Sequence, residues 1–477
     1  FHTLALTENG ALFSFGGGER GQLGLGDDRS NHALPEELQK VVHSFRSYRV
    51  LEIACGDFHS ACIAVNRDVG PGGLLMTWGF GVAGRLGQGA AHLECCTRPQ
   101  ALSGISVAQS HLKSGAMRLE VGTSRLARLR LAAQNSVRVV SCGSAHSAAI
   151  TTNGQLYMWG ANQFGQLGDG SSPHSTATPK LSRSRTQIVA LVKRVACGLN
   201  HTVVLTQQGL VYAWGCGAEG QLGVTSVGFA EVNHAPLRIV AFDEAAHVVG
   251  VYASESSSAA VTSLGALFTW GNNDFGKLGH GHQHSAPALA RRVGGLLADE
   301  QVKMCALAPN HTVALTDDGT VYTWGEGWFG RLGTGLTANF CEPQMVRGAI
   351  EGLRCDHVAA GAYHTMAVCM GDLYVWGRND LRLGIGENPS QLLSPHRNDA
   401  LWADGKNVVV CSASRNHSIA ICDDGTVWSW GSGAFCKLSH ENRARAVTEG
   451  APTGASAISI TAPQQADVSV PGRVVLF

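Results

Sequence analysis

The chain has 477 residues with 36 Lys and Arg against 36 Asp and Glu, so its zero net charge gives no global sign of a nucleic-acid or membrane partner. Its 44% apolar residues exclude a disordered chain, and no apolar run approaches the ~20 residues that cross a bilayer. Glycine supplies 60 residues and charged residues only 15%, which is typical of a turn-rich, all-β protein.

A repeated aromatic–glycine pair divides the chain into eight copies of one motif. Phe15-Gly16 comes first, and Trp-Gly pairs follow at Trp78, Trp159, Trp214, Trp270, Trp324, Trp376 and Trp430. In six copies Gly-x-Leu-Gly begins six residues after the aromatic residue, and the last two copies are degenerate. A His before Ser or Thr precedes the pair at His2, His59, His146, His201, His311, His364 and His417, and Ser257 takes this position in the fifth copy. Such self-similarity indicates a repeat architecture.

Each copy predicts four short strands. The sixth copy predicts an apolar strand over 311–316, a hairpin turn at Asp318-Gly319 and a second strand over 321–324. A strand after a proline, as at Pro343, and a Val- or Ala-rich strand before the next His complete the set. Four antiparallel strands per repeat are typical of a β-propeller blade. We predict an all-β propeller; seven and eight four-stranded blades both stay open, because the first copy lacks its leading strand and the eighth is degenerate.

The C-terminal residues 468–477 resemble the post-proline strand of a further copy. We predict that they pair beside the N-terminal strand, since closing the ring removes the exposed edges of an open sheet. Because Phe1 lies inside a motif copy, we expect residues 1–477 to be a single propeller domain from a longer chain.

The motif Cys-Gly-x-x-His-Ser/Thr, Asp/Asn-Gly-x-Leu/Val-Tyr-x-Trp-Gly and Gly-Gln-Leu-Gly resembles the regulator of chromosome condensation repeat family over nearly the whole chain. The resemblance implies a propeller that usually has seven blades. It implies one of two functions: a non-catalytic protein-interaction scaffold, or a guanine nucleotide exchange factor for a Ran-type small GTPase with chromatin contact. The family's plant ultraviolet-B photoreceptors carry Gly-Trp-Arg-His-Thr copies, where this sequence has Gly-Asp-Phe-His, Gly-Ser-Ala-His and Gly-Leu-Asn-His, so photoreception is not expected.

The repeated histidines and tryptophans are interpreted as structural residues. Successive histidines belong to different blades, too far apart to hold one metal ion, and a hydrogen-bonded core His is the commoner role. The Trp-Gly tryptophans are predicted to wedge between blades. Trp328 is an extra tryptophan in a glycine-rich loop and is a candidate partner-binding residue.

No catalytic or cofactor motif occurs in the sequence. The Gly-x-Gly-x-x-Gly runs, such as 215–220, lead into a Leu-Gly turn instead of the helix that would hold a pyrophosphate. A nucleophile elbow, a phosphate-binding loop and zinc-site cysteine spacing are all missing. We predict no enzyme activity, no cofactor and no metal, and free thiols in preference to disulfides for the 14 scattered cysteines.

A basic insertion separates the second and third copies. Trp78 and Trp159 are 81 residues apart, and the excess length falls around residues 103–135. From 98 to 218 there are 12 basic residues but only Glu120 and Asp169 as acidic ones. Arg118, Arg125, Arg128 and Arg130 are candidate contacts for an acidic protein surface or a nucleic-acid backbone, and a solvated loop is the alternative.

The sequence thus favours an intracellular scaffold, in the cytoplasm or nucleus, that binds a protein such as a small GTPase or an acidic surface. Chromatin is the more weakly supported partner, and no membrane contact is expected.

Overall fold

The computed structural model of the chain describes most of the eight motif copies. The described residues are 2–7, 9–26, 32–38, 42, 45–67, 73–89, 94–102, 105, 136–170, 174–182, 188, 190–224, 232–242, 246–284, 289–386, 389–403, 405–415, 417–431 and 468–474.

In these residues eight antiparallel sheets follow one another along the chain, one for each motif copy. The first has three strands, β1 (His2–Leu6), β2 (Leu12–Gly16) and β3 (His32–Glu37), so the missing leading strand is confirmed there. The second to fourth sheets contain β4 (Tyr48–Cys55), β5 (His59–Asn66), β6 (Gly73–Phe80) and β7 (Cys95–Ala101); β8 (Val137–Cys142), β9 (His146–Thr151), β10 (Leu156–Gly160) and β11 (Thr176–Leu181); and β12 (Val192–Cys197), β13 (His201–Thr206), β14 (Val211–Cys216) and β15 (Val232–Ile239).

The remaining four sheets repeat this order from the inner strand to the outer one. They contain β16 (Val248–Ala253), β17 (Ser257–Thr262), β18 (Leu267–Gly271) and β19 (Arg291–Arg292); β20 (Val302–Leu307), β21 (His311–Thr316), β22 (Val321–Gly325) and β23 (Phe340–Met345); β24 (Cys355–Ala360), β25 (His364–Cys369), β26 (Asp372–Arg378) and β27 (Gln391–Arg397); and β28 (Val408–Ala413), β29 (His417–Cys422), β30 (Val427–Gly431) and β31 (Val468–Val474). Helix α4 (Asp399–Ala403) lies between the last two sheets in sequence.

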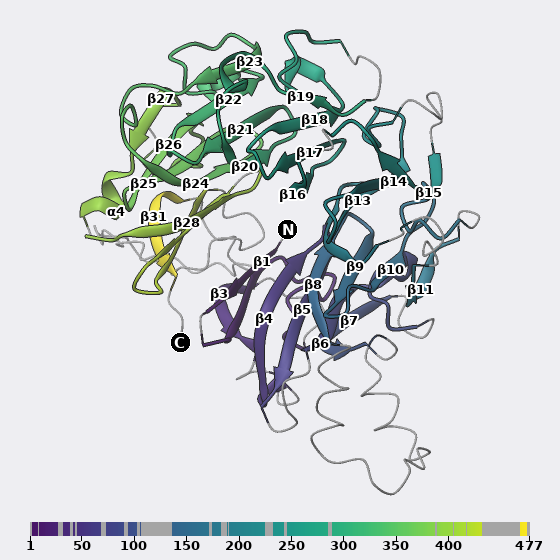
Figure 1. Cartoon of the computed structure of the whole chain (residues 1–477). Helices are drawn as coiled ribbons and strands as arrows, with labels where there is room; N and C mark the ends of the chain where they lie inside the picture. Colours follow the sequence, from purple (N-terminus) through teal and green to yellow (C-terminus); the bar gives the residue numbers. More distant parts are fainter. Residues whose placement is uncertain are drawn as a thin grey trace, which may run out of the picture.

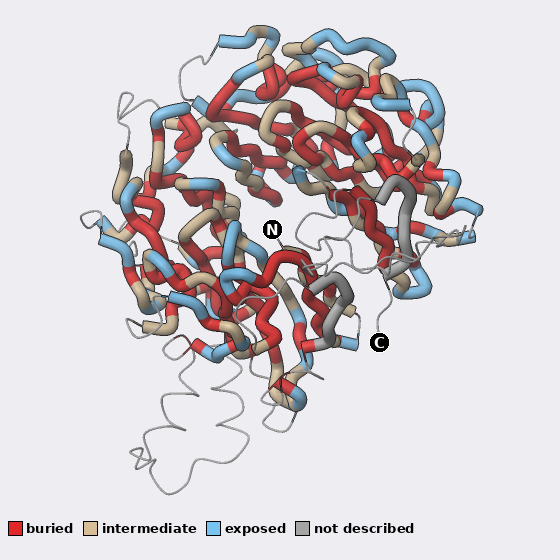
Figure 2. The backbone as a smooth tube through the Cα atoms, turned by 180° about the vertical axis from the view of Figure 1, so that it is seen from behind, coloured by how far each residue is buried: buried red, intermediate tan, exposed pale blue. Residues whose placement is uncertain are grey.

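The sheets surround a common centre, as Figure 1 shows, with β4, β8, β16, β20, β24 and β28 nearest to it. We call the side with the Gly-x-Leu-Gly loops the loop face. The other side carries the hairpin turns between the second and third strands of each sheet, such as Asn153-Gly154, and we call it the turn face. Second and third strands are buried along nearly their whole length, whereas exposed residues gather at the loops and rims (Figure 2).

Each tryptophan joins its sheet to the one before it. The indole Nε1–H of Trp214 donates to the backbone oxygen of Gln166 at 2.8 Å, and that of Trp324 donates to Lys277 O at 2.8 Å. The last glycine of each Gly-x-Leu-Gly lies flat against this ring, since a Cβ on Gly168 would stand 2.6 Å from the Trp214 Nε1. The Trp-Gly and Gly-x-Leu-Gly motifs therefore recur together because they touch across every blade interface.

Each histidine joins its sheet to the one after it. His59 Nε2 lies 2.8 Å from Ser147 Oγ, and the same contact links His146 to Thr202 at 3.1 Å and His201 to Ser258 at 2.8 Å. The hydroxyl donates its own proton to a backbone oxygen of the earlier sheet, as Thr202 does to Gln166 O at 2.9 Å. A hydroxyl has one proton, so the histidine must be the Nε2–H tautomer and donate to the hydroxyl oxygen.

The ring closes by this same contact and not through the C-terminal strand. His417 Nε2 of the eighth sheet lies 3.5 Å from Thr3 Oγ1 of the first. The predicted pairing of 468–477 beside the N-terminal strand is wrong: β31 pairs with β30, with Val427 opposite Val474, and so supplies the fourth strand of the eighth sheet. The described residues form seven sheets of four strands and one of three, which agrees with the predicted seven or eight blades.

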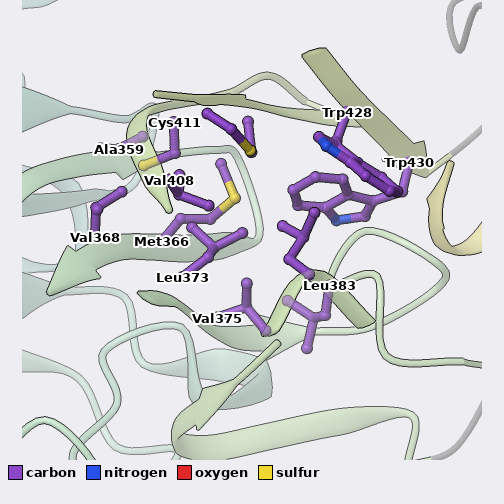
Figure 3. Packing of buried hydrophobic residues seen from close by; sticks show 13 residues of the cluster. Ala359, Met366, Val368, Leu373, Val375, Leu383, Val408, Cys411, Trp428 and Trp430 are labelled. Atoms are coloured by element: carbon purple, nitrogen blue, oxygen red, sulfur yellow. The ribbon is translucent and has the colours of Figure 1, made fainter. Parts of the chain in front are cut away.

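The hydrophobic core is divided among the blade interfaces. Between the seventh and eighth sheets, Met366, Leu373 and Leu383 pack against Trp430 (Figure 3). Among the described cysteines eleven are free, whereas Cys355 and Cys369, opposite each other on β24 and β25, form a disulfide with Cα atoms 3.7 Å apart. The expectation of free thiols throughout is therefore wrong at this pair, because cross-strand neighbours meet at short range.

Candidate partner-binding face

The Gly-x-Leu-Gly loops take one of two forms, and the residue after the first glycine decides which. In the first, third and fourth sheets this residue is Gln. The Gln166 Oε1 accepts the backbone N–H of Phe164 at 2.9 Å, and Gln22 and Gln221 accept the N–H of Arg20 and Glu219 in the same way. The glutamine side chain thus holds its own loop in place.

The other five copies have a basic residue there, which has no acceptor to offer, and four of these residues are described. Two residues before Arg85, Lys277 and Arg331, the backbone of Ala83, Phe275 and Phe329 has φ near +60°, a conformation that non-glycine residues rarely adopt. The charged end of the basic side chain instead bonds to a backbone oxygen of the next sheet: Lys277 Nζ donates to Pro309 O at 2.6 Å and Arg331 Nη1 to Ala362 O at 2.9 Å. Arg85 and Arg382 donate in the same way to Ser144 O at 3.3 Å and Arg415 O at 3.2 Å.

The basic loops of the sixth and seventh sheets, together with Arg378 of β26, place three arginines around two aromatic rings. Tyr363 and Phe329 meet edge to face at 6.5 Å. The Arg378 Cζ lies 4.7 Å from the centre of the Phe329 ring, and the Arg382 and Arg331 Cζ atoms lie 5.4 and 5.3 Å from that of Tyr363. We call Phe329, Arg331, Tyr363, Arg378 and Arg382 the arginine–aromatic cluster.

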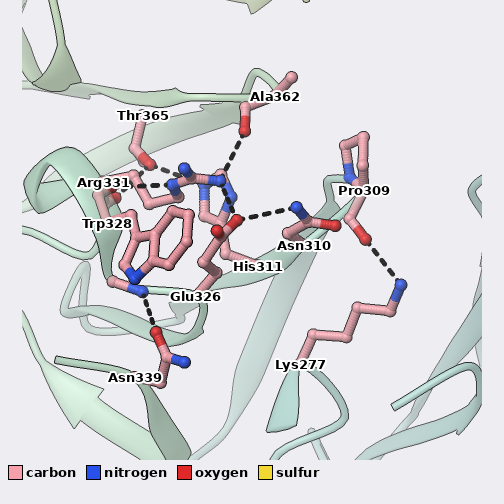
Figure 4. A network of polar contacts seen from close by, with 11 residues as sticks. Lys277, Pro309, Asn310, His311, Glu326, Trp328, Arg331, Asn339, Ala362 and Thr365 are labelled. Carbon is pink, nitrogen blue, oxygen red and sulfur yellow. Dashed lines mark hydrogen bonds and ion pairs between the residues drawn. The ribbon is translucent and has the colours of Figure 1, made fainter. Parts of the chain in front are cut away.

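A buried ion pair holds Arg331, one member of the cluster, in place (Figure 4). Arg331 Nη1 lies 2.5 Å from Glu326 Oε2, and the two side chains are only 1% and 5% exposed. Asn310 Nδ2 donates to the same oxygen at 2.8 Å. Burying a charged pair costs desolvation energy that these hydrogen bonds offset, so the loop that carries Trp328 and Phe329 is held rigidly.

Trp328 stands beside the cluster and is 59% exposed. Asp380 accepts from Arg378 and Arg382, so the cluster has three cations against the two anions Glu326 and Asp380. An exposed indole beside partly exposed guanidinium groups is the composition of binding hot spots, which are enriched in Trp, Tyr and Arg.

The centre of the ring opens on the loop face as a cavity of about 580 Å³. Its wall includes Cys142, Cys197, Glu255 and Arg415. Burial raises the pKa of Cys197 to about 12 and raises that of Cys142 as well, so both thiols are protonated at neutral pH. A protonated thiol is a poor nucleophile, so these groups offer no acyl or thiol chemistry.

The structure places the predicted residues in three groups. His59, His146, His201, His311, His364, His417 and the seven Trp-Gly tryptophans all lie in the blade interfaces, and Trp328 lies exposed on the loop face. Arg118, Arg125, Arg128 and Arg130 fall outside the described residues, as does nearly all of 103–135. Sequence reasoning missed Phe329, Tyr363, Arg378 and Arg382; the only available signal was the replacement of Gln by a basic residue in consecutive loops.

No three His, Cys, Asp or Glu side chains in the described ranges are grouped closely enough to hold a metal ion. The described part of the chain also has no helix with the length and hydropathy of a membrane span.

These features define a β-propeller with eight described sheets. The RCC1-like domain model matches residues 113–470, and the regulator of chromosome condensation (RCC1) repeat model matches residues 9–63. The chain is 30% identical over 409 residues to the ultraviolet-B receptor UVR8 of Arabidopsis thaliana, covering 85% of this chain and 81% of that protein. The chain therefore belongs to the RCC1-like family.

The chain is also similar to one further relative and to two solved structures. The chain is 32% identical over 304 residues to the human E3 ubiquitin-protein ligase HERC2, covering 63% of this chain but only 6% of HERC2. Human WBSCR16 has a TM-score of 0.62 at 21% identity, over 87% of this chain and all of that one. Prp20p of Saccharomyces cerevisiae, described with its binding to Gsp1p and histones, also has a TM-score of 0.62, at 20% identity over 87% of this chain and 92% of that one. At these identities the two structures show the fold alone.

Proposed function

We propose that this propeller is a non-catalytic scaffold whose loop face binds a protein partner through the arginine–aromatic cluster and Trp328. The observation that carries the proposal is an exposed tryptophan fixed next to three arginines by a buried ion pair. Rigid aromatic anchors lose little entropy on binding, and guanidinium groups suit carboxylates, so the partner surface is expected to be acidic.

Replacing Trp328 by Ala or Arg378 by Glu is expected to weaken partner binding by about tenfold or more, as for a typical hot-spot residue. Both side chains are at least one-third exposed, so folding should not change. The measurement is a quantitative pull-down with each variant, with melting curves as a check on the fold.

Arg347→Glu is the matched control, because Arg347 is another surface arginine, 69% exposed, that pairs with Glu351 outside the cluster. Loss of the same partners in this control, or their full retention in both cluster variants, would contradict the proposed site.

The basic insertion remains a second proposed contact. Arg125, Arg128 and Arg130 have Glu120 as the only acidic residue near them in sequence. Replacing all three by Ala should reduce partner binding at low salt and have less effect at moderate salt, since contacts between exposed charges are screened. Identical binding of the triple variant and the wild type at both salt concentrations would leave the insertion as a solvated loop.

Nucleotide exchange on a Ran-type GTPase is the second candidate. It is favoured by the fold shared with Prp20p, whose description names Gsp1p, and by the acidic and basic residues around the loop-face cavity. The experiment is release of a labelled guanine nucleotide from Ran with and without the propeller. Clear acceleration supports exchange activity, and an unchanged rate supports the scaffold.

Similarity to an ultraviolet-B receptor does not carry photoreception to this chain. The residues two positions before the repeated histidines, where the photoreceptor motif has its tryptophan, include Asp57, Ser144, Pro309 and Ala362, and none of the described ones is a tryptophan. Seven tryptophans are instead enclosed in the blade interfaces, where they act as wedges.

A further inference from the structure

The seven complete sheets share an irregularity in their innermost strands. In β4, β8, β12, β16, β20, β24 and β28 the register with the second strand shifts by one residue at the same place. The residue skipped by the ladder is Leu51, Arg138, Lys193, Val249, Lys303, Asp356 or Val409 in turn. A bulge redirects the side chain of its extra residue, and we call these seven residues the bulge ring.

The bulge ring lies at the turn-face end of the innermost strands, opposite the arginine–aromatic cluster. In five of the seven sheets the residue before the bulge donates its backbone N–H to the hairpin turn of the preceding sheet, as Val192 does to Gly154 O at 3.0 Å and Val302 to Gly265 O at 2.9 Å. The innermost strands themselves surround the centre of the molecule (Figure 1). The seven bulges therefore encircle the centre on the face that the proposed function does not use.

Three bulge residues have large apolar side chains that are exposed to solvent. Leu51 is 52% exposed, Val409 46% and Val249 40%, and Val410, next to Val409, is 39% exposed. A single exposed Val or Leu needs no explanation, but these share one structural position on three sheets. They lie on the second, fifth and eighth sheets, so each would supply a separate apolar contact to a partner that runs around the ring.

The sheets between them add positive charge. Arg138, Lys193 and Lys303 are bulge residues, and Arg194 follows Lys193 as a second exposed cation. The Arg138 guanidinium donates to Lys193 O at 2.9 Å, so the cations of the third and fourth sheets are adjacent. The ring also carries one acid, Asp356, whose carboxylate lies 4.0 Å from Arg354, and nearby Glu52 accepts from Val140 N at 3.4 Å.

We propose that the bulge ring binds an extended segment of a protein partner in which carboxylates alternate with aliphatic side chains. The aliphatic side chains would cover Leu51, Val249 and Val409, and the carboxylates would meet Arg138, Lys193, Arg194 and Lys303. A single-stranded nucleic acid fits less well, because such sites use aromatic side chains for stacking and none of the seven bulge residues is aromatic. This site is separate from the loop face, so either proposal can fail without the other.

The test uses fluorescence polarisation with the intact 477-residue chain and a fluorescein-labelled peptide of alternating Glu and Leu. Two variants remove the two halves of the site: Lys193→Glu with Arg194→Glu, and Leu51→Ser with Val409→Ser. Each pair is expected to weaken peptide binding by about tenfold or more. Arg347→Glu is the control, because this exposed arginine lies outside both the bulge ring and the arginine–aromatic cluster, and it is expected to bind the peptide as the wild type does.

Three results would overturn the proposal. The first is no binding of the Glu-Leu peptide by the wild type, and the second is unchanged binding in both double variants. The third is equal or tighter binding of an oligothymidine, or of the same peptide with Lys in place of Glu. All changed side chains are exposed, so melting curves of the variants should match the wild type.

Discussion

Replacing Trp214 or Trp324 by Ala should destabilise the propeller by about 3–5 kcal/mol, among the largest effects of a single substitution in a core. Both indoles are fully buried, each in the cluster that joins two sheets. The substitution removes the packed ring, leaves a cavity against the preceding Gly-x-Leu-Gly loop and breaks the bond to the Gln166 or Lys277 oxygen. Because each repeat packs mainly on its neighbours, the damage should spread from that interface.

Conservative variants separate the packing from the hydrogen bond. The Trp324 Nε1–H donates to Lys277 O, whereas the Trp376 Nε1–H has no acceptor among the described residues. Trp324→Phe should therefore cost more than Trp376→Phe, by about 1 kcal/mol for the lost hydrogen bond. Urea denaturation of the four variants gives the comparison. Melting temperatures unchanged by both Ala substitutions would show that these tryptophans do not hold the blades together.

The repeat made the fold predictable, because the regular spacing of the motifs identifies residues that make the same contact in each copy. The Trp-Gly and Gly-x-Leu-Gly motifs are separate in sequence, yet Gly168 lies against Trp214 as its equivalents do elsewhere. The His-to-Gly register was also implicit in the motif: His59 pairs with Gly79 and His364 with Gly377 even though their spacings to the tryptophan differ. Loop insertions leave the strand register unchanged, so irregular spacing did not hide the fold.

The interaction surfaces were not predictable in the same way, since they depend on how copies differ. Phe329 and Tyr363 belong to different sheets and meet only because the basic loops cross from one sheet to the next. The bulge ring depends on a shift in register that cannot be recognised from residue type, since Leu, Val, Lys, Arg and Asp all occupy the extra position. The β31 strand was assigned to the wrong partner because a post-proline strand fits the outer edge of any sheet.

Acid should unfold this propeller more steeply than carboxylate titration alone would explain. Burial lowers the pKa of His59, His146 and His364 to about 3 and that of His201 to about 4, and the pKa of His311 lies well below its ordinary value of 6.5. Their Nδ1 atoms have no hydrogen-bond partner in the described part of the chain. Protonation would place an unsatisfied charged N–H against backbone, since a Cβ on Gly56 would already stand 2.5 Å from the His59 Nδ1.

The direction of the effect follows from linkage. Below pH 6.5 the unfolded chain binds protons at these histidines and the folded chain does not, so stability is fully present above pH 6.5 and falls as the pH drops towards 3. At pH 5.5 each histidine should remove about 1.4 kcal/mol, and five together roughly 7 kcal/mol, which is comparable to the whole stability of a typical domain. Most carboxylates titrate below this pH, so the range from pH 8 to 5.5 isolates the histidines.

The measurement is urea denaturation, followed by tryptophan fluorescence, in steps from pH 8 to 5.5. His201→Gln is the informative variant, because the glutamine amide can still donate to Ser258 Oγ but does not titrate. It should lower stability at pH 8 and yet flatten the pH dependence by about one proton, or ~1.4 kcal/mol per pH unit. Equal stability of the wild type at pH 8 and pH 5.5 would mean that the histidines bind protons in the folded state as readily as in the unfolded chain, and the conclusion that burial keeps them neutral would then be wrong.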